Sequence, residues 1–390
     1  MKNIVIVSYG FSAEKITLQP WRYVYEIGRR LQKRGYHASI VTDSPAPDDG
    51  VLPGIRVRGG FSLRPFSGRS LERGIAGISP DIILWPIGVK SVFYAPFLRS
   101  LGAAVLGYFP GPIPGIADFR AALKRRLPKE SFSAALWILA RNTGWAGIMG
   151  SCCKAFIVMS ESNRDALIKM GINGQRLFTV TAGRDSPATP EKNSNTIVKD
   201  KGPCAPERKA LYMGSPHPAR GIDLLLAAFK SAARRGAGVH LTVLSRGEGT
   251  RWHKRLREGV ARHPERGKIT LVEGFLPKEV VLRHIFECDF GVLPFIQAPA
   301  DRPISFLEFF AAGKPVISTD ASGIPELIGN DRGRICGRNN PGELAAALSQ
   351  MAAMREGEFT QYRDSCLEFI KDYPGWGSSA SKFAEILNKI

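Results

Sequence analysis

The sequence ADRPISFLEFFAAGKPVISTDASGIPELI, residues 300–328, decides the fold of the chain around it. Apolar residues at helical spacing predict a short helix that begins near Pro303 and ends at Gly313. Proline suits a first helical turn because its φ is preset and its missing N–H would be unpaired there. Glycine permits the left-handed residue that ends a helix. The sequence KPVIST then predicts a buried strand, followed by a turn that carries Gly323 and Glu326.

The start of this predicted helix is a candidate anion-binding site. Its first turn presents free backbone N–H groups, which bind phosphate together with the helix dipole. Glu308 lies about one turn farther on, where its carboxylate is placed to accept hydrogen bonds from the two hydroxyls of a ribose. The alternative interpretation is a β-helix-β unit in which the proline only caps the helix.

Strands and helices alternate through both halves of the chain. NIVIVS at 3–8 predicts the first buried strand, and a helix from Pro20 to Gly35 follows. Further helices are expected near 68–77 and 90–101. Repeated units of this kind predict an α/β fold with two doubly wound, Rossmann-like domains that face a central cleft. The later strands are expected at 37–43, 54–59, 81–85, 103–108 and 155–160. A strand and turn are expected at 178–185, a strand that ends at Gly214, a strand and glycine-bearing loop at 240–249, and a strand, turn, helix and strand at 268–295.

The composition is that of a globular protein, with 44% hydrophobic and 23% charged residues among 390. Six cysteines form no CxxC or Cys/His ligand spacing, which argues against structural zinc and favours a reduced, cytoplasmic compartment. The apolar start MKNIVIVSYG predicts a first strand, not a signal peptide. No GxGxxG follows that strand, which argues against a dinucleotide enzyme.

The net charge of +19 is concentrated in the first half of the chain. Residues 1–185 hold 25 Lys and Arg against 12 Asp and Glu, a balance of +13 that leaves +6 for the remainder. A nucleic-acid surface, an anionic membrane surface and a protein with no such partner are the competing interpretations. No basic module with interleaved aromatics supports nucleic-acid binding, so the membrane surface is preferred.

The strongest local basis for a membrane surface is a basic segment followed by an apolar one. FRAALKRRLPK at 119–129 predicts a basic amphipathic helix, and 131–150 holds the single charge of Arg141. The uninterrupted apolar run AALWILA is far shorter than the roughly 20 residues of a spanning helix. The alternative is a solvated basic face beside an ordinary core helix. The basic residues of the first segment are Arg120, Lys124, Arg125, Arg126 and Lys129.

The sequence EFFAAGKPVISTDASGIPELI, from Glu308, resembles the donor-binding signature of the retaining GT-B glycosyltransferases, the glycosyl transferases group 1 (family 4) type. The resemblance implies a GT-B fold, a ribose held by Glu308 and donor phosphates held by the backbone of Ile304, Ser305 and Phe306. The pattern places its first glutamate, eight residues before the one at Glu308, where this chain has Ala300, and Asp301 is the candidate to substitute for it as a catalytic residue.

The same resemblance extends to the loops after residue 209. KALYMGSPHPARGIDLLLAAF resembles the loop whose two cations grip the diphosphate: Gly214 and Ser215 occupy the first part, and Arg220 occupies the lysine position. Arginine performs that role through a bidentate, permanently charged fork. Arg246, beside Gly247, is the candidate for the charge missing at Ser215. Three further residues are expected to border the nucleobase, namely Gly274, Phe275 and Leu276.

The resemblance also divides the chain. It implies an acceptor-side domain at 1–185, a Pro-, Lys- and Ser-rich linker at 186–208, a donor-binding domain at 209–372, and a helix at 373–390 that packs back on the first domain. Loop 109–119 follows a strand end, where ligands gather in parallel sheets. Its acceptor-side residues are Pro110, Gly111 and Pro112.

The expected reaction is transfer of a hexose-type sugar from a nucleotide-diphosphate donor to a glycan, glycolipid or lipid-linked acceptor, with retention of configuration. A diphosphate leaves without an acid if positive charge and amide dipoles accept its developing charge, so no metal or other cofactor is expected. The expected location is cytoplasmic, peripheral on the inner face of the cell membrane, with no nucleic-acid partner. The alternative is a glycosyltransferase-like binding or scaffold subunit, because Ala300 lacks the carboxylate.

Overall fold

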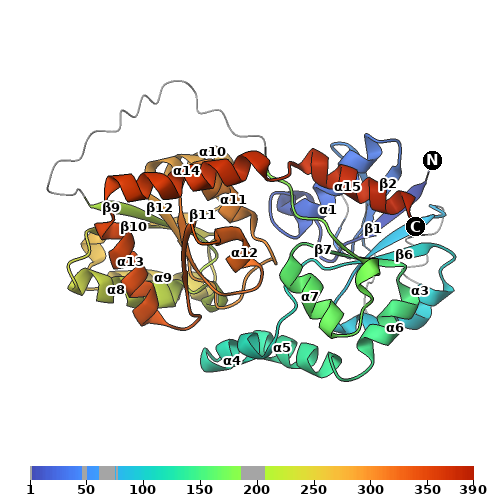
Figure 1. Ribbon diagram of the computed structural model, residues 1–390, viewed down its shortest axis with the longest axis horizontal. Helices are drawn as coiled ribbons and strands as arrows, with labels where there is room; N and C mark the ends of the chain where they lie inside the picture. The colour runs from blue at the N-terminus through green and yellow to red at the C-terminus, as the bar shows by residue number, and fades with distance from the viewer. Residues whose placement is uncertain (1, 46–50, 61–74, 76–77, 186–206) are drawn as a thin grey trace.

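The computed structural model describes residues 2–45, 51–60, 75, 78–185 and 207–390. It contains two α/β units, each with a parallel sheet between layers of helices (Figure 1). This confirms the predicted fold class. The helix expected near 68–77 and residues 186–206 of the expected linker fall outside the described residues, apart from Ile75 in the former.

The first unit is built on a sheet of eight strands in the order β3-β4-β2-β1-β5-β6-β7-β8, parallel except for β3 with β4. Its strands are β1 (Asn3–Val7), β2 (His37–Val41), β3 (Val51–Leu52), β4 (Ile55–Arg58), β5 (Ile82–Pro86), β6 (Ala104–Tyr108), β7 (Ala155–Val158) and β8 (Leu177–Thr179). Its helices are α1 (Trp21–Gln32), α3 (Ala95–Ser100), α4 (Ile116–Lys124), α5 (Pro128–Ala140), α6 (Trp145–Cys152) and α7 (Glu161–Lys169), with short 3-10 turns η1 (Ala13–Lys15), η2 (Val89–Tyr94) and η3 (Gly174–Arg176).

The second unit is built on six parallel strands in the order β11-β10-β9-β12-β13-β14. They are β9 (Arg208–Gly214), β10 (Val239–Arg246), β11 (Ile269–Gly274), β12 (Phe290–Leu293), β13 (Val316–Thr319) and β14 (Gly333–Cys336). Its helices are α8 (Ile222–Arg234), α9 (Arg251–Ala261), α10 (Lys278–Glu287), α11 (Ile304–Ala311), α12 (Ile324–Ile328), α13 (Pro341–Ala353) and α14 (Glu356–Asp372), with η4 (Pro218–Arg220) and η5 (Arg266–Lys268). The last helix, α15 (Trp376–Asn388), follows α14 and packs on the first unit.

The stretch 300–328 forms the expected helix and strand as α11 and β13. The fully buried aromatic side chains of Phe306, Phe309 and Phe310 hold α11 against its sheet, and Gly313 has the left-handed φ of +65° after the helix. The predicted turn that carries Gly323 and Glu326 is wrong in part, because Glu326 lies in the short helix α12, which begins directly after Gly323. Pro325 explains this, since proline is suited to the first turn of a helix.

The two units are joined by several contacts in addition to the chain itself. Helix α14 runs along the second unit, and α15 continues onto the first, where it packs on α1 (Figure 1). A Cβ atom at Gly183 would lie 2.3 Å from the backbone nitrogen of Trp376, so only glycine allows this crossing. On the other side, Ala121, Ala122 and Leu127 of the α4–α5 region pack into the core of the second unit.

The predicted basic helix 119–129 is wrong in its bounds. Helix α4 ends at Lys124, Arg126 has a positive φ of 52°, and Pro128 begins the new helix α5. The apolar segment 131–150 likewise forms two helices, α5 and α6, separated near Gly144. The sequence pattern did not resolve these breaks because basic and apolar residues continue at helical spacing across them. Among the described residues, no helix has both the length and the apolar character needed to span a membrane.

Candidate functional site

A cavity of about 350 Å³ lies where the two units face each other. Most of its wall comes from the second unit, where the carboxyl ends of β9, β10 and β11 meet at one edge of the sheet. Parallel register places these ends together, because Ser245 pairs with Gly214 and Arg246 pairs with Gly274. Ligands of open α/β sheets bind at this edge. Ten predicted residues line the cavity, from these strand ends and the loops after them, from η4 and from α11, and they are Gly214, Ser215, Arg220, Arg246, Gly274, Phe275, Leu276, Ile304, Ser305 and Glu308.

Arg220 reaches the cavity from η4, the turn between β9 and α8. One guanidinium nitrogen donates a hydrogen bond to the backbone oxygen of Gln297, 2.8 Å away, and burial lowers the pKa of the group. Within the part of the chain that the structure describes, Arg220 makes no ion pair. Gly221 ends η4 with a φ of +74°, and a Cβ there would lie 1.9 Å from the oxygen of Pro294. The turn therefore requires glycine, and it holds a cation that has no acidic partner among the described residues.

Arg246 and Phe275 line another part of the cavity. Arg246 ends β10, and its charge lies close enough to Arg220 to lower the pKa of that group further. The side chain of Phe275 is 78% exposed after β11 and borders the cavity. An exposed aromatic face at this position is suited to stacking on a nucleobase.

Glu308 lines the same cavity and a smaller neighbouring one of about 70 Å³. It lies on the second turn of α11, on the side opposite the buried aromatic residues. Burial raises the pKa of its carboxyl, and the positive charges of Arg22 and Lys278 oppose that rise. Arg246 opposes it as well. The carboxylate thus faces cations from both units.

The N-terminus of α11 is in contact with the first unit. The side-chain oxygen of Gln19 accepts a hydrogen bond from the Ile304 amide at 3.0 Å, and its nitrogen donates to the Arg302 oxygen at 3.1 Å. The amide of Phe306 bonds to the Pro303 oxygen within the turn. Of the three backbone amides expected to hold phosphate, only that of Ser305 donates no hydrogen bond to another described residue. Sequence reasoning did not identify Gln19, since nothing in its local pattern places it near residue 304.

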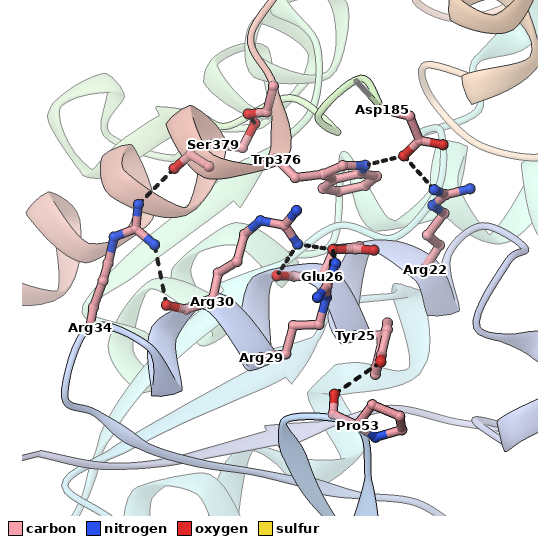
Figure 2. Close-up of polar contacts among 12 residues, drawn as sticks. Arg22, Tyr25, Glu26, Arg29, Arg30, Arg34, Pro53, Asp185, Trp376 and Ser379 are labelled. Atoms are coloured by element: carbon pink, nitrogen blue, oxygen red, sulfur yellow. Dashed lines mark hydrogen bonds and ion pairs between the residues drawn. The ribbon is translucent and has the colours of Figure 1, made fainter. Parts of the chain in front are cut away.

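Sequence reasoning also missed two charged residues of the cavity wall, Arg22 and Lys278, and both pair with Asp185 in one ionic cluster. Asp185 accepts hydrogen bonds from Arg22, from Lys278 at 2.7 Å, and from the indole nitrogen of Trp376 at 3.1 Å. Figure 2 shows Asp185 between Arg22 and Trp376. Burial would raise the pKa of the Asp185 carboxyl, but Lys278 and Arg22 outweigh burial and hold the pKa below its usual value. The cluster joins both units and α15 next to Glu308.

Several predicted site residues do not line this cavity. Asp301 is fully buried, and one of its oxygens accepts a hydrogen bond from the Ser322 hydroxyl at 2.7 Å. Ala300 and the side chain of Phe306 are also fully buried. Gly247 lies behind the wall, where its amide bonds to the Gly274 oxygen. The roles proposed for these residues from sequence stay predictions.

The proposed acceptor-side residues lie apart from the cavity wall as well. Pro110, Gly111 and Pro112 are partly buried in the loop between β6 and α4. The oxygen of Gly111 accepts a hydrogen bond from the side chain of Asn163, whose oxygen accepts one from the Ile113 amide. These bonds fix the loop to α7. Their acceptor role stays a prediction.

The arrangement favours binding of a phosphorylated, hydroxyl-bearing ligand. Four cationic side chains and a helix N-terminus line the wall, and one partly buried carboxylate faces them. Guanidinium groups without a counter-ion attract phosphate oxygens, and a carboxylate accepts hydrogen bonds from sugar hydroxyls. The cationic residues are Arg22, Arg220, Arg246 and Lys278.

Comparison with known proteins identifies the fold as GT-B. The chain superposes over its full length on sucrose-phosphate synthase from Thermosynechococcus elongatus, with a TM-score of 0.75, 15% identity and 99% of that chain covered. It superposes equally completely on HepE from Anabaena in complex with UDP, with a TM-score of 0.70, 14% identity and 100% of that chain covered.

The match to a family lies in the second unit. The family model described as Glycosyl transferases group 1 matches residues 207–354. Amylovoran biosynthesis glycosyltransferase AmsK of Erwinia amylovora is 30% identical over 139 residues, or 34% of this chain and 33% of that protein. The putative colanic acid biosynthesis glycosyltransferase WcaL of Escherichia coli is 29% identical over 140 residues, or 34% of each. The alignment thus spans about a third of these relatives' length.

Proposed function

We propose that the protein is a glycosyltransferase that moves a sugar from a nucleotide-diphosphate donor to a glycan, glycolipid or other glycoconjugate acceptor with retention of configuration. The observation that carries the proposal is the meeting of Arg220, Arg246 and Glu308 with the N-terminus of α11 around one cavity. The match of residues 207–354 to the group 1 family supports it. The names of the curated relatives, which are glycosyltransferases of polysaccharide biosynthesis, favour a glycan or lipid-linked acceptor.

In the proposed reaction, the cations of the cavity stabilise the leaving group, so no acidic side chain has to protonate it. The bond between the sugar C1 and the phosphate oxygen breaks, and an acceptor hydroxyl oxygen bonds to C1 on the same face. The acceptor proton passes to the leaving phosphate. Arg220 and Arg246 stabilise the charge that develops on the diphosphate, which removes the need for the paired carboxyl groups of a glycoside hydrolase. Arg22 and Lys278 add positive charge beside Glu308.

The ribose and the base of the donor are assigned to residues by the position of those residues in the cavity. Glu308 accepts hydrogen bonds from the ribose hydroxyls, and Phe275 and Leu276 border the base. UDP is the first nucleotide to test, because the Anabaena HepE structures contain UDP and UDP-glucose. Since the proposed charge stabilisation comes from side chains, chelation of divalent cations with EDTA should leave the rate unchanged.

A thermal-shift panel of nucleotide sugars tests the proposal. One nucleotide should raise the melting temperature by several degrees, because a ligand at a hundred times its Kd stabilises the folded state by about 2.7 kcal/mol. The same nucleotide should give a much smaller shift with Arg220→Ala and with Glu308→Gln. A panel without any shift, or a shift that both variants retain, would contradict the proposed donor site.

A second candidate function is a binding or scaffold subunit without transfer activity. The observation that favours it is the absence of a carboxylate at position 300, where the fully buried Ala300 stands, together with the burial of Asp301 away from the cavity. Transfer and hydrolysis assays with the nucleotide sugar found in the panel distinguish the two functions. Turnover supports the enzyme, whereas tight binding without turnover supports the scaffold.

A further inference from the structure

An apolar surface is exposed on the helices α4 and α5, which lie along the lower edge of the molecule in Figure 1. Four large apolar side chains are more than half exposed there: Ile116 at 53%, Leu123 at 58%, Phe132 at 62% and Leu139 at 59%. Single exposed apolar residues are common, but four on two adjacent helices mark an interaction surface. We call these four residues, with Arg120, Lys124 and Arg126, the α4–α5 surface.

The cations of this surface share the helix face of its apolar residues. On α4, Ile116, Arg120 and Leu123 recur at intervals of four and three residues, which places them on one face. Lys124 and Arg126 are exposed beside them. Within the described part of the chain, these three cations make no ion pair. On α5, Phe132 and Leu139 are seven residues apart and therefore lie on one face as well.

The acidic residues of this region point away from the surface. Asp118 and Glu130 are the two acids between residues 113 and 150. Asp118 accepts a hydrogen bond from Arg338 at 2.6 Å, and Glu130 lies 3.9 Å from His217, both in the second unit. The α4–α5 surface therefore combines apolar side chains and cations without any acidic side chain.

Arg125 has a different role from its basic neighbours. It donates hydrogen bonds to Asn339 at 2.6 Å and to Asp223 at 2.7 Å, and so ties α4 to the second unit. The contact between Glu130 and His217 places α5 beside the loop that also carries Ser215 and Arg220. A partner on the α4–α5 surface would therefore lie near the donor cavity.

We propose that the α4–α5 surface docks on an anionic lipid bilayer. Its apolar side chains enter the boundary between headgroups and acyl chains, while its cations bind the anionic headgroups. Both features are needed for this partner. A nucleic acid would use the cations but leave Phe132 and Leu139 in water, and an apolar protein surface would leave the cations without counter-ions. The proposal goes beyond the transfer reaction, because it requires neither a donor nor turnover.

Vesicle flotation with the full-length protein tests the proposal. The wild type should float with vesicles of equal parts phosphatidylglycerol and phosphatidylcholine, and far less with phosphatidylcholine alone. Changing Arg120, Lys124 and Arg126 together to glutamine should weaken partitioning about a hundredfold, since each surface cation contributes about fivefold. Phe132→Ser with Leu139→Ser should weaken it about tenfold for each lost side chain. All five positions are exposed, so the variants should keep the melting temperature of the wild type.

The matched control removes three charges from the opposite edge of the molecule. Arg363, Lys371 and Lys382 are exposed on α14 and α15, at the top of Figure 1, and their change to glutamine should leave partitioning within about twofold. Three results would each overturn the proposal: no flotation of the wild type, no loss with the α4 triple variant, or no loss with the two serines. Because no sugar nucleotide is present, these results are independent of the donor-binding test.

Discussion

The two walls of the cavity differ in how they are built. The wall from the second unit consists of consecutive loops at strand ends and one helix N-terminus, and most of its residues lie within short, recognisable stretches. The wall from the first unit consists of residues 17–19 and Arg22, and it depends on contacts across the interface. Under the proposed function, the second unit holds the diphosphate and ribose, whereas the first unit adds the charge of Arg22 beside Glu308.

The largest effect is expected for Arg220→Ala, which removes the cation of η4 from the second wall. We expect kcat/KM for the donor to fall about 10²–10³-fold, because the cation stabilises the charge that develops on the leaving diphosphate. Steady-state kinetics measure this. Arg262→Ala is the control, since that side chain is 76% exposed and pairs locally with Glu258. If Arg22→Ala costs as much as Arg220→Ala, the two walls contribute equally and the comparison fails.

A smaller loss is expected for Glu308→Gln. The donor should bind more weakly by roughly 1.5–3 kcal/mol, the contribution of hydrogen bonds to a charged group. Affinity should also depend on pH in the wild type. Since the pKa of Glu308 is raised, the carboxylate becomes protonated, and donor affinity falls, at a higher pH than for an ordinary glutamate. Titration calorimetry at several pH values measures both effects. A pH-dependent affinity that persists in Glu308→Gln would show that another group titrates.

Sequence reasoning predicted the second wall better than the first for a physical reason. Helix α11, the glycine after it and β13 follow from local spacing, and the loop residues Gly214 to Arg220 are close in sequence. Gln19 reaches Ile304 across 285 residues, and Lys278 reaches Asp185 across 93. Such contacts depend on how the two units pack against each other. The local spacing of residue types along the sequence therefore cannot predict them.

The breaks within α4–α6 were missed for a related reason. Hydrophobic and basic periodicity continues through residues 119–129, so the pattern favours one helix, whereas the positive φ of Arg126 and the proline at 128 divide it. The sequence also did not predict the role of Arg125. The same residue pattern is compatible with an arginine exposed to solvent and with one that binds Asp223. Hydrophobic periodicity thus predicted the elements, while the turn at Arg126 and Pro128 determined their bounds and tertiary contacts determined the role of Arg125.

A moderate effect on stability is expected for Asp185→Asn, which breaks the ionic cluster between the walls. The free energy of unfolding should fall by about 1 kcal/mol near neutral pH. The loss is this small because the ion pairs of Asp185 with Arg22 and Lys278 are partly exposed to solvent. Asp185 has a lowered pKa, so its contribution is present above the ordinary carboxyl pKa and is lost as pH falls through the lowered value. The free energies of unfolding of the wild type and of Asp185→Asn, measured with urea, should therefore become equal at low pH. A difference that stays constant with pH would contradict the ionic origin.

The smallest effect is expected for Gln19→Ala, which frees the Ile304 amide at the tip of α11. In the present structure this amide bonds to Gln19, so a phosphate must replace that side chain to reach it. We expect the variant to bind the donor diphosphate a few-fold more tightly, because one hydrogen bond of about 1 kcal/mol no longer competes. Titration calorimetry with the nucleoside diphosphate measures this change directly.

The control for Gln19→Ala is Gln32→Ala, which removes a glutamine bond to the Ala38 oxygen inside the first unit and should leave affinity unchanged. If Gln19→Ala instead weakens donor binding, then Gln19 contacts the donor itself or holds the closed position of the first wall. That result would give the first unit a direct part in binding the diphosphate. The amides at the start of α11 would then act together with Gln19, not in competition with it.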